Sequence, residues 1–217
     1  MDAKSNAFTL IFSLLSERYG QQPWWPADDE FEIMVGAILT QNTAWTNVEK
    51  ALSSLKQKGL CNSHSLSTID QQKLAEIIRP SGYFNQKSKR LISFSQWYKQ
   101  QGGFQNLKSK SLVLLRKELL ELNGIGDETA DDILLYAFDL PSFIIDTYTR
   151  RIFTRLEMLS ENSPYLELQQ MFRQNLNTDV NLFQQYHALI VAHAKKHCLK
   201  KPVCVNCPLL EHCNFEL

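Results

Sequence analysis

The sequence predicts an all-α protein with a cysteine-rich C-terminal loop, and three observations support this prediction. Apolar residues recur at helical spacing along most of the 217 residues, as they do on the buried face of an amphipathic helix. No stretch shows the alternation of apolar and polar residues that is typical of a half-buried strand. Four of the five cysteines are crowded into the last twenty residues, where the helical pattern stops.

The composition is that of an ordinary soluble protein. A hydrophobic content of 44% is enough for a sizeable core in one body or two small lobes. No stretch approaches the roughly 18 apolar residues of a membrane helix, and the first twenty residues lack a cleavage site. We therefore expect no membrane contact and a location in the cytoplasm, associated with the nucleoid if the protein binds DNA. A monomer is also expected.

The formal net charge of zero argues against DNA binding by bulk electrostatics. Local basic clusters would then have to attract the phosphates. One such cluster comprises Lys87, Lys89 and Arg90, although a charge run is as often only a solvated face.

The first half of the chain predicts helices over residues 5–19, 30–43, 46–55 and 71–79, with residues 57–70 as a loop. Thr46 is a plausible cap for the third helix. Between the first two helices, two tryptophans stand in a proline-bounded loop, Trp24-Trp25-Pro26. These tryptophans either pack the loop onto the core or form the wall of a pocket. A glycine turn at Gly82 precedes a further helix from about residue 87.

The second half of the chain begins with two helices, over 112–122 and 127–138, joined by a tight turn at Gly124 and Gly126. Such a turn leaves N–H groups uncovered at a helix start, where the helix dipole favours an anion such as phosphate. An apolar run over 143–145 then leads to Asp146, at the start of a helix over 147–156. We expect this acid to lie beside the core. Further helices are predicted over 165–175 and 181–197.

The four C-terminal cysteines have the spacing C-x5-C-x2-C-x5-C. Without an export signal, disulfides are not expected. Thiolates this close in sequence can converge on one metal centre. From the residues alone, a structural zinc and a [4Fe–4S] cluster both remain open.

Three segments together resemble the endonuclease III-like superfamily of DNA glycosylases. They are LNGIGDETADDILLYAF followed by IIDT, the stretch GAILTQNTAWTNVEKAL, and the cysteine loop. The motifs WWP, RPSGYFNQK and GIGDE are most similar to the type III 3-methyladenine DNA glycosylase branch. The resemblance implies two helical lobes. One comprises 27–135, with a helix-hairpin-helix motif over about 112–138, and the other comprises 1–26 plus 136–217, with a cluster loop over 198–213.

The resemblance also implies roles for individual residues. Asp146 would be the catalytic aspartate, and Gln41 would be the wedge that fills the gap left by an extruded base. An ordinary helix C-terminal amide is the alternative reading of Gln41. The base pocket would comprise Trp24, Trp25, Pro26, Trp45 and Glu128, and the DNA backbone would be bound by Gly124, Ile125, Gly126, Thr129 and Lys87.

For the cysteines, the resemblance implies a [4Fe–4S] cluster, with structural zinc as the alternative. Family members have the spacing C-x6-C-x2-C-x5-C, so this chain has one residue fewer in the first gap. The ligands would be Cys198, Cys204, Cys207 and Cys213.

The expected activity is base excision from double-stranded DNA that carries a damaged base. Bifunctional members place a lysine two residues after the second hairpin glycine, where its amine forms a Schiff base. Here that residue is Glu128, which predicts a monofunctional glycosylase without lyase activity, although an acid in a first helical turn also has a structural reason. Tryptophan faces favour a cationic base such as 3-methyladenine. The alternatives are a glycosylase for oxidised pyrimidines or mismatched bases, and a noncatalytic DNA-binding module.

Overall fold

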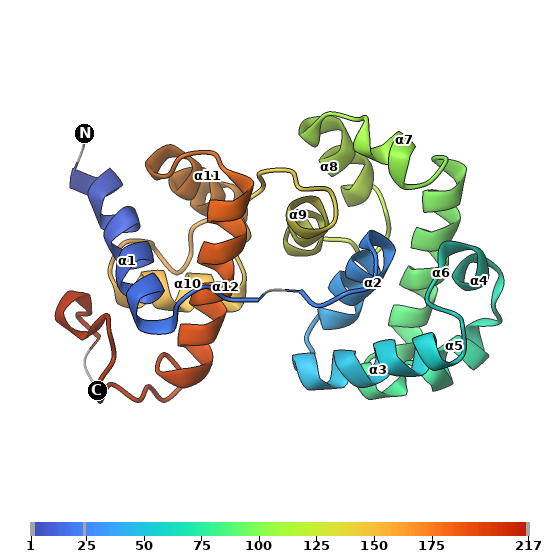
Figure 1. Cartoon of the computed structure of the whole chain (residues 1–217), viewed down its shortest axis with the longest axis horizontal. Coiled ribbons are helices and arrows are strands. Elements are labelled where there is room, and N and C mark those ends of the chain that lie inside the picture. Colours follow the sequence, from blue (N-terminus) through green and yellow to red (C-terminus); the bar gives the residue numbers. More distant parts are fainter. Residues whose placement is uncertain (1–2, 24, 216–217) are drawn as a thin grey trace. The chain divides into compact units, whose positions relative to one another are not determined.

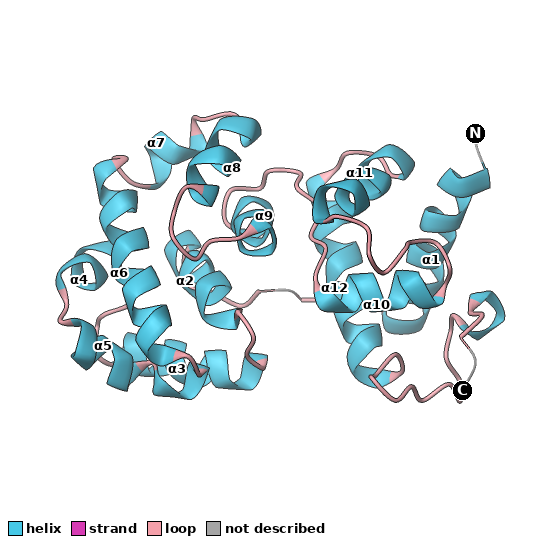
Figure 2. Ribbon diagram, turned by 180° about the vertical axis from the view of Figure 1, so that it is seen from behind, coloured by secondary structure: helices cyan, strands magenta, loops and turns pink. Residues whose placement is uncertain are grey.

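The computed structural model describes residues 3–23 and 25–215, with side chains from residue 7 onward. Within these ranges the chain forms helices and connecting loops without a strand (Figure 2), which confirms the predicted fold class. None of these helices combines the length and apolarity that a membrane span needs. The chain divides into two compact units: the inserted unit, Trp25–Leu140, and the terminal unit, made of the segment before it together with Pro141–Leu217.

The inserted unit is organised around α2 (Glu30–Thr40), which contacts the helices α3, α6 and α9 (Figure 1). Seven of the eleven residues of α2 are buried apolar residues or glycine, so most of its circumference is covered. The other elements are α3 (Trp45–Gln57), α4 (Ser63–Thr68), α5 (Gln71–Ile77), η1 (Arg79–Ser81), α6 (Phe84–Gln100), α7 (Phe104–Lys108), α8 (Leu112–Leu120) and α9 (Asp127–Tyr136).

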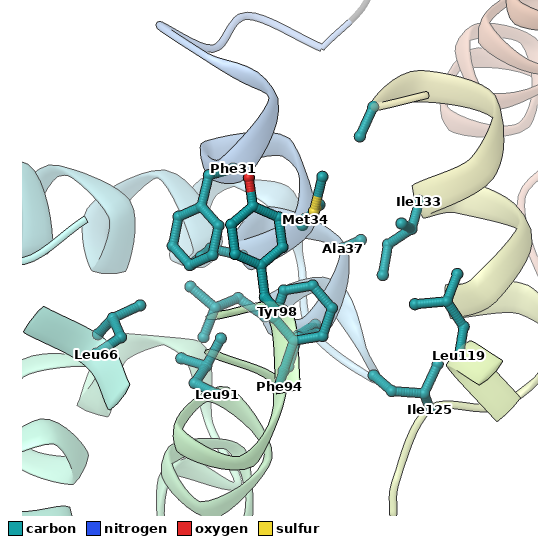
Figure 3. Close-up of a cluster of buried hydrophobic side chains, with 14 of the residues drawn as sticks. Phe31, Met34, Ala37, Leu66, Leu91, Phe94, Tyr98, Leu119, Ile125 and Ile133 are labelled. Atoms are coloured by element: carbon teal, nitrogen blue, oxygen red, sulfur yellow. The ribbon is translucent and has the colours of Figure 1, made fainter. Parts of the chain in front are cut away.

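The core of the inserted unit joins α2 to the helices around it (Figure 3). Phe31 of α2 makes an edge contact with Tyr98 of α6, with ring centroids 5.1 Å apart. On the other side, Leu119 and Ile133 bring α8 and α9 into the same cluster. Residues from both halves of the hairpin motif therefore anchor it to the core.

The terminal unit packs α1 (Ala3–Tyr19) and α10 (Thr147–Arg155) against α12 (Val180–Lys196), while α11 (Tyr165–Asn175) contacts α1 (Figure 1). Its core is aromatic: Phe143 and Phe172 stack with centroids 4.0 Å apart. The phenol of Tyr186 in α12 donates to the carbonyl of Phe8 in α1 at 2.8 Å. A short turn, η2 (Leu210–His212), lies in the cysteine loop directly before Cys213.

Two local predictions were wrong. The stretch 57–70 contains α4, because the side chain of Asn62 accepts a hydrogen bond from the Ser65 amide at 2.9 Å and Leu66 is fully buried. Thr46 does not cap α3, which begins one residue earlier, at Trp45. Both misses concern helix starts, where a few local hydrogen bonds decide the boundary.

Candidate functional site

The turn between α8 and α9 is a tight hairpin held by main-chain hydrogen bonds. The amide of Ile125 donates to the carbonyl of Leu122 at 3.0 Å, and the Gly126 carbonyl accepts the first helical bond of α9 from Ala130 at 2.9 Å. Gly124 has a φ of +86°, a conformation that favours glycine. The side chain of Ile125 is only 5% exposed and joins the core, so this residue can offer a ligand only its main chain.

The two hairpin glycines serve different purposes. A Cβ on Gly124 would lie 2.2 Å from Nε of Arg90, so the guanidinium stem of Arg90 occupies the space above this glycine. Gly126 is extended, with φ −98°, and a Cβ there would meet nothing within 4 Å. The main chain at Gly126 therefore lies next to open space at the start of α9.

Gln41 is tied to this hairpin from the C-terminal end of α2. Its Nε2 donates to the Gly124 carbonyl and to Oγ1 of Thr129, both at 2.9 Å. Its Oε1 accepts a short hydrogen bond from Nη1 of Arg90. The structure thus brings together Gln41, Gly124 and Thr129, all predicted site residues. Arg90 was not among them, and its only signal in the sequence was membership of a basic cluster.

Charge at the start of α9 is balanced within the hairpin motif. Arg116 of α8 binds Asp131 through two hydrogen bonds, Nε to Oδ1 at 2.9 Å and Nη2 to Oδ2 at 3.0 Å. Its Nη2 also donates to Asp127 at 2.6 Å. Glu128, the second residue of α9, is exposed. The clamp neutralises one of the two first-turn acids, which would otherwise oppose an anion there.

Lys87 lies in the core rather than on the surface. It is 1% exposed, and its Nζ donates to the carbonyls of Leu39 and Ser81 at 2.8 and 2.7 Å and to Oγ1 of Thr43 at 2.8 Å. These three bonds use all the donors of an ammonium. Burial, followed by the nearby charge of Arg90, lowers the pKa of Lys87 to about 8. The ammonium of Lys87 is therefore not available for the phosphate contact that was predicted for it.

An aromatic cluster forms at the N-terminal edge of the inserted unit. The ring of Trp25 lies 5.3 Å from that of Trp45 in an edge arrangement and 5.2 Å from that of Tyr136. Gly36 makes room for Trp25, because a Cβ there would lie 3.2 Å from the indole. The buried indole Nε1 of Trp25 makes no hydrogen bond within the described part of the chain.

Two of the predicted pocket residues, Trp25 and Trp45, are thus brought together. Pro26 is exposed, and Trp24 lies outside the described residues. Tyr136 was missed because a tyrosine near the end of an amphipathic helix is ordinarily a core residue.

Asp146 is the N-cap of α10, as its place after an apolar run predicted. Its Oδ1 accepts a hydrogen bond from the Thr149 amide at 2.6 Å, and its Oδ2 lies 3.7 Å from Nε2 of His187 in α12. The side chain is 12% exposed. Burial raises the pKa of Asp146, but His187 and the Thr149 amide lower it more, so the pKa lies below the ordinary value. The carboxylate is therefore held ionised beside the core.

The four C-terminal cysteines line one pocket of the terminal unit. Residues of α10 and the end of α12, including Ile152 and His193, complete its lining. Nη1 of Arg155 lies 3.1 Å from Sγ of Cys198. Among the described residues, no three His, Cys, Asp or Glu side chains converge closely enough to hold a single metal ion.

Comparison with known proteins agrees with this set of features. Residues 35–178 match the model of the HhH-GPD superfamily base excision DNA repair proteins. A protein of Methanocaldococcus jannaschii with the provisional name of a DNA repair glycosylase is 45% identical over 97% of this chain and 98% of its own length. A thymine-DNA glycosylase of Aeropyrum pernix is 26% identical over 91% of this chain and 88% of its own.

Solved structures show the same fold. A 3-methyladenine DNA glycosylase of H. pylori, solved with bound 1,N6-ethenoadenine, is 32% identical, with a TM-score of 0.75 over 88% of this chain and 97% of its own. An endonuclease III bound to DNA has a TM-score of 0.84 over 99% of this chain and 96% of its own, at 20% identity. At 20% identity, the similarity to endonuclease III shows only that the two proteins share a fold.

Proposed function

This chain belongs to the HhH-GPD superfamily of base excision DNA repair proteins and is a DNA repair glycosylase of the endonuclease III superfamily, and we propose that it is a monofunctional enzyme that releases alkylated purines. The observation that carries the proposed cleavage of the glycosidic bond is the ionised, largely buried carboxylate of Asp146 at the start of α10. A fixed negative charge at such a place stabilises the positive charge that develops on the sugar as the glycosidic bond breaks.

The reaction is a hydrolysis. The bond between the base nitrogen and C1′ breaks, and its electron pair leaves with the base. A water oxygen bonds to C1′ and loses a proton to the solvent, since a cationic alkylated purine leaves as a neutral base. An abasic site remains in the strand. Asp146 stabilises the cationic sugar or orients this water. The damaged nucleotide must first leave the stack, and we propose that Gln41 fills the space it vacates.

For the duplex contacts, we propose the main chain of the hairpin at Gly124 and Gly126, together with Thr129. Open space beside Gly126 supports this assignment, because a backbone N–H group can approach a phosphate only where no side chain intervenes. The amide of Gln41 is engaged by Gly124, Thr129 and Arg90. Entry into a duplex therefore requires Gln41 to exchange these hydrogen bonds for contacts with DNA.

Alkylated purines are favoured by the aromatic cluster and by the 32% identity to the H. pylori enzyme. A cationic methylated ring is attracted to tryptophan faces, and Trp25 and Trp45 lie edge to face in the inserted unit. The absence of lyase activity is inferred from Glu128, since a carboxylate cannot form the imine that strand cleavage requires.

For the cysteines, we propose a structural [4Fe–4S] cluster held by Cys198, Cys204, Cys207 and Cys213. Their common pocket supports the assignment. When bound, the cluster supplies four iron–thiolate bonds that join the loop to the end of α12.

The test is base release from three duplexes, containing methylated purines, an oxidised pyrimidine or a G·T mismatch, each analysed with and without alkali. We expect methylated adenine from the first, with strand breaks only after alkali. Breaks without alkali would contradict the monofunctional mechanism. Release from another duplex instead would assign the enzyme to that base, and the thymine-DNA glycosylase relative is the reason for including the mismatch.

The catalytic role of Asp146 is tested with a matched pair of variants. Asp146→Asn should abolish base release, while Asp179→Asn should leave it unchanged. Asp179 is also an N-cap, accepting from the Leu182 amide at 2.7 Å, and asparagine caps helices as well as aspartate does. Equal activity of the two variants would show that the negative charge of Asp146 is not needed.

A further inference from the structure

The terminal unit directs a buried histidine at the carboxylate proposed for catalysis. His187 is 4% exposed, and its Nε2 is 3.7 Å from Oδ2 of Asp146. The two residues are 41 positions apart in sequence and come from different helices, α12 and α10. Their proximity is a product of how these helices pack.

The position of His187 is determined by the helix that carries it. The side chain of Asp179 caps the first turn of α12, and the Tyr186 hydroxyl ties the middle of the helix to the Phe8 carbonyl at 2.8 Å. Tyr186 precedes His187 directly and is fully buried. The contacts of Tyr186 therefore fix the rotation of α12 about its axis at the residue next to His187.

The two oxygens of Asp146 are distinguished by their surroundings. Oδ1 is used by the helix, because it accepts from the Thr149 amide at 2.6 Å. Oδ2 faces Nε2 of the imidazole at 3.7 Å, close enough for direct contact although beyond an ordinary hydrogen bond. Oδ2 is thus the carboxylate oxygen available for the reaction, and His187 limits the rotation of the carboxylate group.

We propose that His187 is a positioning residue for the glycosylase reaction, which orients Oδ2 of Asp146. The inference rests on the proposed role of Asp146. A carboxylate that stabilises a cationic sugar must be ionised and correctly oriented before the base leaves, because misplacement by about 1 Å can cost about a hundredfold in rate. The Thr149 amide restrains one oxygen, and His187 restrains the other.

The test compares His187→Leu, His187→Gln and Asp146→Asn. The substrate is whichever of the three duplexes releases a base with the unchanged protein. Single-turnover base release reports the chemical step, and binding to a duplex with a tetrahydrofuran abasic analogue reports affinity. Leucine fills similar volume without a donor, whereas glutamine keeps an N–H group. We expect His187→Leu to slow the chemical step about a hundredfold, with analogue binding within twofold of the unchanged protein, and His187→Gln to recover at least tenfold of the rate.

The outcomes separate this inference from the proposed function. Loss of activity in Asp146→Asn but a full rate in His187→Leu would overturn the positioning role alone. Full activity in Asp146→Asn, or none in the unchanged protein on any duplex, would overturn the proposed function and this inference with it. If His187→Leu does not fold, His187→Gln decides: a slower chemical step with unchanged binding of the analogue supports the proposal, and a rate equal to that of the unchanged protein overturns it.

Discussion

The two glycines of the hairpin differ in backbone conformation and in the space around them. Gly124 is left-handed and lies under the Arg90 side chain, whereas Gly126 is extended beside open space. The sequence shows the same letter at both positions. Only the structure separates a glycine needed by the fold from one whose open surroundings suit a ligand.

We predict that Gly124→Ala lowers the free energy of unfolding by about 1–3 kcal/mol, through the strained φ and the displaced Arg90. Gly126→Ala should change it by less than about 1 kcal/mol, while weakening DNA binding. Urea unfolding and duplex-binding titrations of both variants measure these effects. Equal destabilisation by the two substitutions would contradict the distinction.

Lys87 makes the stability of the protein depend on pH. Its pKa is about 8 in the folded state and about 10.4 in an unfolded chain. Between these values the unfolded state binds more protons, so the contribution of Lys87 to the free energy of unfolding increases with pH. Below about pH 8 both states are protonated, and this contribution is constant.

We therefore predict that stability measured from pH 7 to 10 increases more, or decreases less, in the unchanged protein than in Lys87→Met. The comparison cancels the other groups that titrate in this range. Parallel pH profiles for the two proteins would show that the pKa of Lys87 is not lowered on folding.

At the scale of elements, the hairpin motif depends on a clamp between its two helices. Arg116 of α8 makes a bidentate pair with Asp131, whose side chain is fully buried. Breaking such a pair leaves a buried charge without its partner, which is far costlier than loss of a surface pair.

We predict that Arg116→Met lowers the free energy of unfolding by about 3–5 kcal/mol and weakens duplex binding as the hairpin loosens. Arg79→Met is the matched control. Arg79 pairs with Glu76 at 3.0 Å, but both side chains are more than 60% exposed, so the cost should stay below about 1 kcal/mol. Thermal and chemical unfolding of the two variants measure these losses. A similar loss of unfolding free energy in both would argue against the clamp.

At the scale of the whole molecule, the chain leaves the terminal unit after its first helix, forms the inserted unit, and returns at Pro141. The returning segment brings α10, α11 and α12 together with α1 and ends in the cysteine loop. The proposed cluster would therefore join the last part of the chain to helices formed by earlier parts.

We predict that Cys207→Ser loses bound iron and its visible absorbance and unfolds at lower temperature, by roughly 2–4 °C for each kcal/mol lost. Cys61→Ser should keep both iron and absorbance, because Cys61 belongs to the inserted unit and is not among the residues that line the cysteine pocket. Iron analysis of the purified proteins is the direct measurement. Stoichiometric zinc in place of iron would support the alternative metal.

The all-helical fold, the hairpin motif and the place of Asp146 at a helix start were determined by the sequence alone. Each depends on a local signal: apolar periodicity, closely spaced glycines, or an acid between an apolar run and a helix. Local signals can be interpreted from sequence because residues close together in the chain interact independently of the rest of the fold.

Contacts between distant residues were decided by tertiary structure. Nothing in the sequence places His187 beside Asp146, Arg90 over Gly124, or Tyr136 beside Trp25. For Lys87, the basic cluster predicted an exposed side chain, yet the packing of α2, η1 and α6 surrounds its ammonium with three oxygens. The physical reason is common to all four cases: a side chain acquires its partners from helices far away in sequence, and the helix packing that selects them is set by the core.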